Sequence, residues 1–324
     1  MNCTIRRLVA AAAIALFAQT ASAATDKPEC IAPAKPGGGF DLTCKLAQVG
    51  MQETGLITEP MRVTYMPGGI GAVAYNAIVA QRPAEGNTIV AFSGGSLLNL
   101  ALGKFGKYDE NDVKWLAAIG TDYGMVAVRE DSPYKTLKDL MDALKKDPSK
   151  IVFGAGGSVG SQDWTKAALV ARAAGVEPKK FRFVAFEGGG ETFTALLGGH
   201  IQVASGDASE ALSQLEAKKI RVLAVLADER LPGELNSIPT AKEQGYDVVW
   251  PIIRGFFMGP KVSDADYQWW VDKFNKLLAT PEFAKLRADR GLFPFSKTGA
   301  DLDAYVKQRV PEYRKIGAEF GLVK

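Results

Sequence analysis

The stretch KIVFGAGGSVGSQDW, residues 150–164, decides which fold this chain is expected to adopt. An apolar run at Ile151–Gly154 leads into a glycine-rich turn, and a pattern typical of a helix follows at Asp163–Ala174. Units with this order of strand, turn and helix recur along almost the whole chain, and their alternation indicates largely parallel sheets covered by helices. We therefore expect an α/β fold and not a sandwich or a helical bundle.

Four more glycine-rich turns stand where an expected strand ends and an expected helix begins. They are PGGGFD at 36–41, PGGIG at 67–71, SGGS at 93–96 and EGGG at 187–190. A helix N-terminus leaves about four backbone N–H groups unpaired and carries roughly half a positive charge, so it attracts anions. In an open α/β sheet the ligand lies outside the carboxyl ends of the strands, which is where these turns fall. The set predicts an anion site, although tight turning and packing explain each single turn equally well.

The chain is long enough for two domains. Its 324 residues and hydrophobic content of 47% suit two α/β domains of ordinary size. No glycine- and serine-rich linker separates them, so we expect strands that cross between the domains at Gly124–Glu130 and Val248–Pro260. The predicted first lobe comprises residues 24–124 and 251–324, and the second comprises residues 125–250.

The first 23 residues have the pattern of a secretory signal peptide. Arg6 and Arg7 form the positive region, Leu8–Phe17 the apolar region, and Ala21-Ser22-Ala23 the small-residue cleavage site. The apolar run is about ten residues long, roughly half of what spans a bilayer. We expect cleavage after Ala23 and a secreted mature chain.

The charge balance excludes a strongly basic surface. Without the leader the chain carries 37 Lys and Arg against 36 Asp and Glu, so neither nucleic acid nor an anionic membrane is indicated as a partner.

Two cysteines remain in the mature chain, Cys30 and Cys44, in a compartment that permits disulfides. A bridge between them would close a loop of about 15 residues and stabilise the fold by roughly 3 kcal/mol. We expect this disulfide; two reduced, buried thiols are the alternative.

One glycine turn also resembles a catalytic motif. Gly156–Gly160 matches the G-x-S-x-G pattern of a nucleophile elbow, with Ser158 as the nucleophile. The single histidine, His200, stands in an expected turn between a helix and a strand, too early in the chain for the base of such a hydrolase. A serine hydrolase is therefore kept as the alternative function.

The sequence indicates no cofactor. The glycine turns match no nucleotide-binding motif, and the small number of histidines and cysteines disfavours a transition-metal site.

Two charged residues are candidates for direct ligand contact. Arg254 lies in the second crossover segment, and its guanidinium offers a planar fork of donors that matches a carboxylate. The alternative for Arg254 is an ion pair at the surface. Asp207 follows an expected strand, where it either caps the next helix or accepts from a ligand hydroxyl, and we favour the cap. Asp41 and Ser161 also suit helix caps.

Several short motifs occur in one order along the chain. They are APAKPGGGFD (32–41), MPGGIGAVAYN (66–76), KIVFGAGGSVGSQDW (150–164), FEGGGETFTALLGGHIQVASGDASEA (186–211) and IPTAKEQGYDVVW (238–250). Together they resemble the periplasmic receptors of tripartite tricarboxylate transporters, the Bug family, over essentially the whole mature chain. WPIIRGFFMGP (250–260) with SDADYQWW (263–270) resembles the tricarboxylate- or citrate-binding members.

The resemblance implies a type II periplasmic-binding-protein fold, in which two α/β lobes joined by crossover strands enclose a ligand cleft. It implies that the turns at Pro36–Asp41 and Gly156–Gln162 hold a ligand carboxylate, partly through ordered water. It further implies a non-enzymatic protein of the periplasm whose partners are the two membrane subunits of the transporter, and we expect a monomer. The residues predicted to bind the ligand are Gly37, Gly38, Gly39, Phe40, Ser93, Gly156, Gly157, Ser158, Val159, Gly160, Ser161, Gln162, Asp207 and Arg254.

The chain departs from the broader family at two positions. Tyr65 stands where an asparagine is common, and Arg254 stands near a position that is often aromatic. An additional arginine favours a ligand with more than one negative charge. The resulting hypothesis is a receptor that captures a di- or tricarboxylate, citrate first, and delivers it to the transporter. A carboxylate receptor that serves a signalling system is a further alternative.

Overall fold

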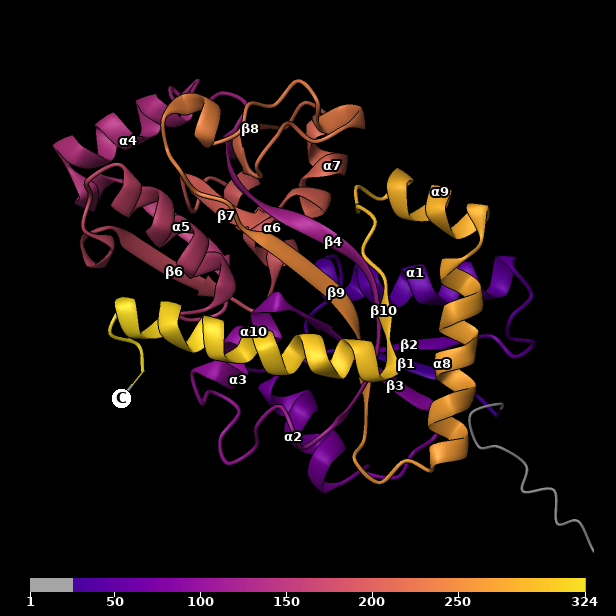
Figure 1. Cartoon of the computed structure of the whole chain (residues 1–324). Coiled ribbons are helices and arrows are strands. Elements are labelled where there is room, and N and C mark those ends of the chain that lie inside the picture. The colour runs from indigo at the N-terminus through magenta and orange to yellow at the C-terminus, as the bar shows by residue number, and fades with distance from the viewer. Residues whose placement is uncertain (1–25, 324) are drawn as a thin grey trace, which may run out of the picture.

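Two long strands, β4 (Lys114–Arg129) and β9 (Pro251–Met258), join the two halves of the computed structural model, which describes residues 26–323. The strands pair with each other in antiparallel fashion along the first part of β4. From Gly124 onward, β4 pairs with the strands of a second sheet. Figure 1 shows both strands running diagonally from one half of the molecule to the other. The predicted signal peptide and its cleavage site lie outside the described residues.

The first sheet has a parallel half and an antiparallel half. β1 pairs in parallel with β2 and β3, and β3 pairs in antiparallel fashion with β9. The remaining strand, β10, pairs with β4. The elements of this half, besides β4 and β9, are β1 (Glu29–Ala32), α1 (Gly39–Glu53), β2 (Arg62–Tyr65), α2 (Ala72–Ala80), β3 (Thr88–Ser93), α3 (Gly94–Ala101), α8 (Asp264–Leu278), α9 (Pro281–Asp289), β10 (Lys297–Thr298) and α10 (Gly299–Glu319).

The second sheet is built in the same way. β5 pairs in parallel with β6 and β7, while β7 and β8 pair in antiparallel fashion with the end of β4. Its elements are α4 (Leu137–Lys146), β5 (Val152–Gly156), α5 (Gln162–Ala173), β6 (Arg182–Phe186), α6 (Gly189–Leu197), β7 (Val203–Asp207), α7 (Ala208–Glu216) and β8 (Ile220–Leu226). Short 3₁₀ turns lie at Pro148–Lys150, Pro178–Lys180, Gly233–Leu235 and Lys242–Gln244. The expected α/β fold class is confirmed, but both sheets are mixed, whereas the sequence pattern predicted largely parallel sheets.

Three apolar clusters form the interior. One lies under the first sheet and includes residues of α1 and α8, and another lies under the second sheet and includes residues of α6 and α7. The third cluster is shared by both halves and includes Trp164 of α5, Ile252 of β9 and Val306 of α10. In Figure 1, α10 lies across both halves, and its C-terminal end reaches α5, where the rings of Phe320 and Trp164 are 5.6 Å apart. We propose that the two sheets mark two lobes, 24–124 with 251–324 and 125–250.

The first crossover strand is longer than the sequence predicted. β4 begins at Lys114, whereas the pattern indicated a strand only from about Gly124. Gly120 and Asp122 interrupt the apolar run and resemble turn signals. Pairing with β9 on one side and β10 on the other keeps this backbone extended, and that pairing depends on residues more than 100 positions away.

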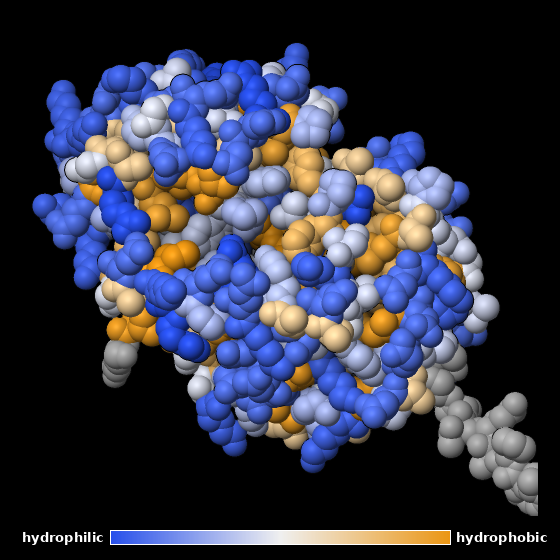
Figure 2. All heavy atoms as spheres, viewed as in Figure 1, coloured by the Kyte–Doolittle hydropathy of each residue, from blue (hydrophilic) through white to orange (hydrophobic). Residues whose placement is uncertain are grey.

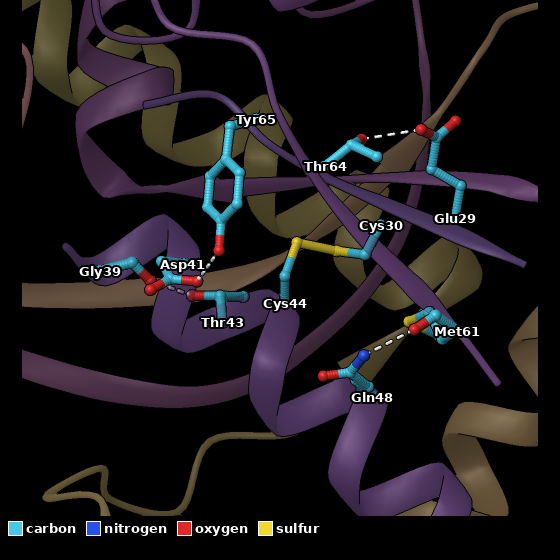
Figure 3. Close-up of a disulfide and its surroundings, with 10 residues drawn as sticks. All are labelled: Glu29, Cys30, Gly39, Asp41, Thr43, Cys44, Gln48, Met61, Thr64 and Tyr65. Carbon is cyan, nitrogen blue, oxygen red and sulfur yellow. Dashed lines mark hydrogen bonds between the residues drawn. A yellow bond between two sulfur atoms is a disulfide. The ribbon is translucent and has the colours of Figure 1, made fainter. Parts of the chain in front are cut away.

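Cys30 and Cys44 form the expected disulfide. The bond links β1 to α1, and both residues are fully buried. Figure 3 shows it beside Asp41, whose carboxylate accepts a hydrogen bond from the Tyr65 hydroxyl at 2.8 Å. The disulfide joins the second turn of α1 to β1, and this hydrogen bond holds the first turn of α1 against the carboxyl end of β2.

The surface is mostly polar. Figure 2 shows hydrophilic side chains over most of this face, with hydrophobic groups scattered among them. The large hydrophobic side chains exposed among residues 26–323 are Tyr65, Val73, Val159 and Val184. None of the helices in the same range is both long enough and apolar enough to cross a membrane.

Removal of the disulfide is expected to destabilise the protein. The double variant Cys30→Ala/Cys44→Ala should lose roughly 3 kcal/mol of unfolding free energy, because its unfolded chain is no longer constrained by the closed loop. Urea denaturation with and without a reductant measures this loss. The wild type should respond to the reductant and the double variant should not; equal responses would contradict a stabilising role of the bond.

Candidate functional site

Five helix N-termini meet at one cleft between the two sheets. The cleft is lined by residues from both halves of the molecule. α1, α3, α5, α6 and α7 each follow a strand or turn whose last residues reach this cleft. The lining residues are Ala34, Gly38, Gly39, Phe40, Ile70, Ser93, Gly95, Gly156, Gln162, Asp163, Gly188, Gly189, Asp207, Glu210 and Arg254.

Arg254 is buried at the centre of this arrangement. Its Nη2 donates to Asp122 Oδ2 at 2.7 Å and to Asp207 Oδ2 at 2.6 Å, and its Nε donates to Asp122 Oδ2 at 3.2 Å. Only 1% of the residue is exposed, so the alternative of a surface ion pair is wrong. Its Nη1 atom lies against the start of α1, since a Cβ atom built on Gly39 would lie 2.0 Å from it. The cleft wall therefore requires glycine at position 39.

Lys166 of α5 forms a second buried cation beside Arg254. Its Nζ donates to Asp207 Oδ1 at 2.5 Å and to the Gly206 carbonyl at 2.7 Å, and it pairs with Asp163 Oδ1 at 2.8 Å. These three acceptors match the three N–H bonds of an ammonium group. Lys166 is thus fully used by the protein and supports the site from behind.

Asp207 occupies the N-cap position of α7 but does not cap it. Its side chain makes no cap hydrogen bond, and the favoured interpretation of Asp207 as a helix cap is wrong. The carboxylate instead accepts from both buried cations, Lys166 and Arg254. Burial raises the pKa of Asp207, but these two positive charges outweigh the effect and leave the pKa below its ordinary value.

The other two expected caps differ from each other. Ser161 caps α5, as predicted, by accepting from the backbone N–H of Trp164 at 3.3 Å. Asp41 lies inside the first turn of α1, whose N-cap is Gly38, so it is not the N-cap residue itself. Its carboxylate reaches back to the N–H of Gly37 at 2.9 Å and fixes the glycine turn that leads into the cleft.

Two of the helix ends that meet at the cleft hold carboxylates of the protein itself. Glu210 accepts from the backbone N–H of Gly39, the first residue of α1, at 2.5 Å. Its other oxygen lies over the start of α6, because a Cβ atom on Gly189 would lie 1.9 Å from Glu210 Oε2. Asp122 accepts from the N–H of Ser209 at the start of α7, at 3.2 Å. A helix N-terminus attracts anionic oxygens whether they belong to a ligand or to the chain.

The charged cluster around the cleft contains more carboxylates than cations. The carboxylates belong to Asp122, Asp163, Asp207 and Glu210, and the cations to Arg254 and Lys166. Two like charges about 5 Å apart repel by ~3 kcal/mol at an effective dielectric constant of about 20. Protons or a ligand with donor groups must relieve part of this excess.

Burial and neighbouring acids shift the pKa values of this cluster. Burial and the charge of Asp207 raise the pKa of Glu210 to about 8, against the opposing effect of Arg254. Burial also raises the pKa of Asp122 and of Asp163 above the ordinary range for aspartate. Near neutral pH the folded protein therefore holds a proton on Glu210 for much of the time.

The structure brings many of the predicted ligand-binding residues together. Those that line the central cleft are Gly38, Gly39, Phe40, Ser93, Gly156, Gln162, Asp207 and Arg254. Gly37 lines a hollow beside α1 and α7, and Gly157, Ser158 and Ser161 line another hollow beside the end of β6. Val159 is half exposed, and Gly160 lies against Leu322 near the C-terminus. Their contacts with a ligand remain predictions.

Four charged residues of the cluster were missed from the sequence: Asp122, Asp163, Lys166 and Glu210. Asp122 had no usable signal, because the sequence indicated the crossover strand only from about Gly124 and Asp122 resembled a turn residue. Asp163 and Lys166 stand three positions apart on α5, a spacing that places them on one helix face. Glu210 had none, since an acidic residue in the first turn is ordinary in a helix.

The serine hydrolase alternative is not supported by the geometry. Ser158 follows β5 at the carboxyl edge of the second sheet, whereas His200 precedes β7 at the amino edge. β5 and β7 run parallel, so the serine and the histidine lie at opposite edges of this sheet.

Within residues 26–323, no group of three histidine, cysteine, aspartate or glutamate side chains is arranged to hold a metal ion.

The family model for the tripartite tricarboxylate transporter family receptor matches residues 46–322. This chain belongs to that receptor family. The receptor is 25% identical over 334 residues to the UPF0065 protein of the gbd 5′ region of Cupriavidus necator, covering 97% of this chain and 95% of the relative. It is 26% identical over 299 residues to a UPF0065 protein of Agrobacterium vitis, covering 89% and 83% of the two chains.

Solved structures share the fold of the receptor. MatC from Rhodopseudomonas palustris, solved with malate, superposes with a TM-score of 0.79 at 20% identity, covering 90% of this chain and 98% of its own. The periplasmic binding protein BugD superposes with a TM-score of 0.80 at 21% identity, covering 92% and 98%. A second R. palustris protein, solved with adipate, gives 0.79 at 17% identity, covering 91% and 97%. The receptor thus has the fold of periplasmic binding proteins, as the sequence motifs implied.

Substitution of Arg254 is expected to lower the unfolding free energy, because its two aspartate partners then stay buried without it. Removing one member of a buried ion pair costs about 3–5 kcal/mol, because the other charge stays buried without a partner. Arg254→Met should lose about this much unfolding free energy, and adding Asp122→Asn should restore part of it. Urea denaturation of the single and double variants measures the coupling; strictly additive losses would argue against the pair.

Glu210 is expected to make the stability of the receptor depend on pH. Its pKa rises from 4.5 in the unfolded chain to about 8 in the folded protein, next to the acids Asp207 and Asp163. The folded state therefore binds this proton more tightly, and the stabilisation is complete below about pH 4.5 and lost as the pH rises through about 8, by at most ~5 kcal/mol.

Urea denaturation across this pH range tests the effect. The wild type should lose more stability than Glu210→Gln between about pH 5 and 8. Glu216→Gln is the matched control, since Glu216 is exposed on the same helix, α7. Parallel curves for the wild type and Glu210→Gln would show that Glu210 titrates normally.

Proposed function

We propose that this receptor captures a small organic acid in the periplasm and presents it to the membrane subunits of a tripartite transporter. The observation that carries the proposal is the convergence of five helix N-termini and Arg254 on one cleft between the two sheets. The cleft is concave, as a site for a small ligand requires. The receptor acts as a monomer and without catalysis in this proposal.

Two structural relatives support a carboxylate as the ligand. MatC was solved with malate and the second R. palustris protein with adipate, and both share this fold. In our receptor, the backbone N–H groups at the start of α5 and the Nη1 atom of Arg254 are the donors that remain for a carboxylate, because Glu210 accepts from Gly39 at the start of α1 and lies over the start of α6. These donors neutralise about one carboxylate, because the other atoms of Arg254 and all of Lys166 are already paired.

Citrate is the least favoured of the candidate acids. The hypothesis of a citrate receptor rested on the resemblance of residues 250–260 and 263–270 to citrate-binding members and on Arg254 as an additional cation. Two aspartates neutralise Arg254 in the structure, and the cluster already carries an excess of carboxylates. A trianion would meet several repulsive charges in a site of low dielectric constant, so we propose an acid with one or two carboxylates instead.

Closure of the two lobes would complete the site. β4 and β9 are the connections between the sheets, and small changes along them would open the cleft. A ligand can drive closure only if it binds the closed form more tightly than the open form. Contacts from both sheets, from Gly39 on one side and Gly156 on the other, provide that difference.

A thermal-shift assay with succinate, malate, adipate and citrate tests the proposal. A ligand at about 100 times its dissociation constant should stabilise the wild type by roughly 2.7 kcal/mol. Gly39→Ala should abolish the shift, because its Cβ atom would displace Arg254. Gly198→Ala is the control, since Gly198 ends α6 away from the cleft and its nearest neighbour is the exposed His200. The proposal fails if no acid shifts the melting temperature of the wild type or if Gly39→Ala responds as the wild type does.

A further inference from the structure

The starts of α1 and α6 lie backbone against backbone on one flank of the cleft. α1 belongs to the first proposed lobe and α6 to the second. A Cβ atom built on Gly38 would lie 3.4 Å from the backbone N of Gly189, and one built on Gly190 would lie 2.8 Å from the carbonyl oxygen of Pro36. A side chain at Gly190 would not fit, so the close approach of the two lobes requires glycine there.

Glu210 joins these two helix starts. It lies on α7 of the second lobe, and its Oε1 accepts from the backbone N–H of Gly39 in the first lobe at 2.5 Å. Its Oε2 lies over the start of α6, where a Cβ atom on Gly189 would be 1.9 Å away. Neighbouring helix N-termini carry partial positive charges that repel, and an oxygen between them offsets this repulsion. Both the charged and the protonated carboxyl group offer such an acceptor, so the bond joins the lobes in either state.

Other polar contacts between the lobes hold them less firmly. Lys35 pairs with Glu191 across the same flank, but both side chains are partly exposed, and an exposed ion pair contributes little. On the other flank, Lys104 Nζ donates to the Val159 carbonyl at 2.9 Å. The lysine side chain is long and can follow Val159 over a small separation. The bond from the Gly39 backbone to Glu210 has no such freedom at its donor.

Glu210 also has a place to go when this bond breaks. Its side chain lines the cleft and also the hollow beside α1 and α7. A carboxyl group released from Gly39 can therefore turn toward the hollow, where water replaces the lost N–H donor. Release of the bond is thus reversible and requires no rearrangement of α7.

We propose that Glu210 is a latch that holds the two lobes closed without a ligand. The latch is closed when Oε1 accepts from the Gly39 N–H, and it is open when the side chain turns into the hollow. A ligand enters the cleft only in the open form, so the latch limits the fraction of receptor that is accessible at any moment. The inference rests on the proposed closure of two lobes, and it applies to any small ligand of the cleft.

Small-angle X-ray scattering of the protein without ligand tests the latch. The radius of gyration of Glu210→Ala should exceed that of the wild type by about 1 Å, against ~19 Å for a compact chain of this length. Glu210→Gln should stay as compact as the wild type, because its side-chain carbonyl still accepts from Gly39. Glu216→Ala is the matched control, since Glu216 is exposed on the same helix, and it should scatter as the wild type does.

A second variant opens the lobes without touching Glu210. The Cβ atom of Gly190→Ala would press on the Pro36 carbonyl of the first lobe, while alanine suits the helix α6 better than glycine does. Gly190→Ala should therefore remain folded in urea denaturation and expand as Glu210→Ala does. Gly198→Ala, at the other end of α6, is its control and should stay compact.

The outcomes distinguish the latch from the proposed function. Equal radii of gyration for the wild type and both opening variants overturn the latch, whether all are compact or all are expanded. If an acid then still raises the melting temperature of the wild type, the organic acid receptor stands. If both variants expand but no acid shifts the wild type, the latch stands and the proposed function falls. Expansion of Glu210→Gln to the radius of Glu210→Ala would also overturn the latch, because an acceptor at this position would then not hold the lobes.

Discussion

The structure depends most on the buried contact between Arg254 and its two aspartates. Arg254 belongs to β9, Asp122 to β4, and Asp207 to the junction of β7 and α7. Burial of an arginine is tolerated only when its charge and its N–H groups are satisfied. The two crossover strands and the second sheet must therefore meet in one register, and that register places the glycine turns of both lobes around the same cleft.

The helix ends explain both the attraction of the cleft for anions and its selectivity. A helix N-terminus does not distinguish a ligand carboxylate from one of the protein. The chain has used this property twice, with Asp122 at α7 and Glu210 at α1. What remains for a ligand is a limited number of donors next to several acceptors, so the site is suited to discriminate among acids rather than to bind every anion.

Packing around Gly39 connects the fold to the site. The Cys30–Cys44 disulfide and the hydrogen bonds of Asp41 hold the start of α1 in place. This position leaves no room for a side chain at Gly39, because Arg254 fills that space. In the sequence, Gly39 is only one residue of a glycine turn. In the structure, it is the residue at which α1 contacts the buried Arg254.

The sequence by itself determined the α/β class, the glycine turns at the strand ends, the disulfide and the family, because these depend on local patterns of a few to about twenty residues. It also singled out Arg254, Asp207 and Gln162 as site residues, and all three line the cleft. Only the tertiary structure decided that Arg254 is neutralised and that Glu210 occupies a helix end. The reason is physical, because the charge of a site is the sum over residues that β4, β7, α5 and α7 bring together. The strand register that joins β4 to β7 and β9 links residues 77 to 144 positions apart, and such pairing leaves no local signal in the sequence.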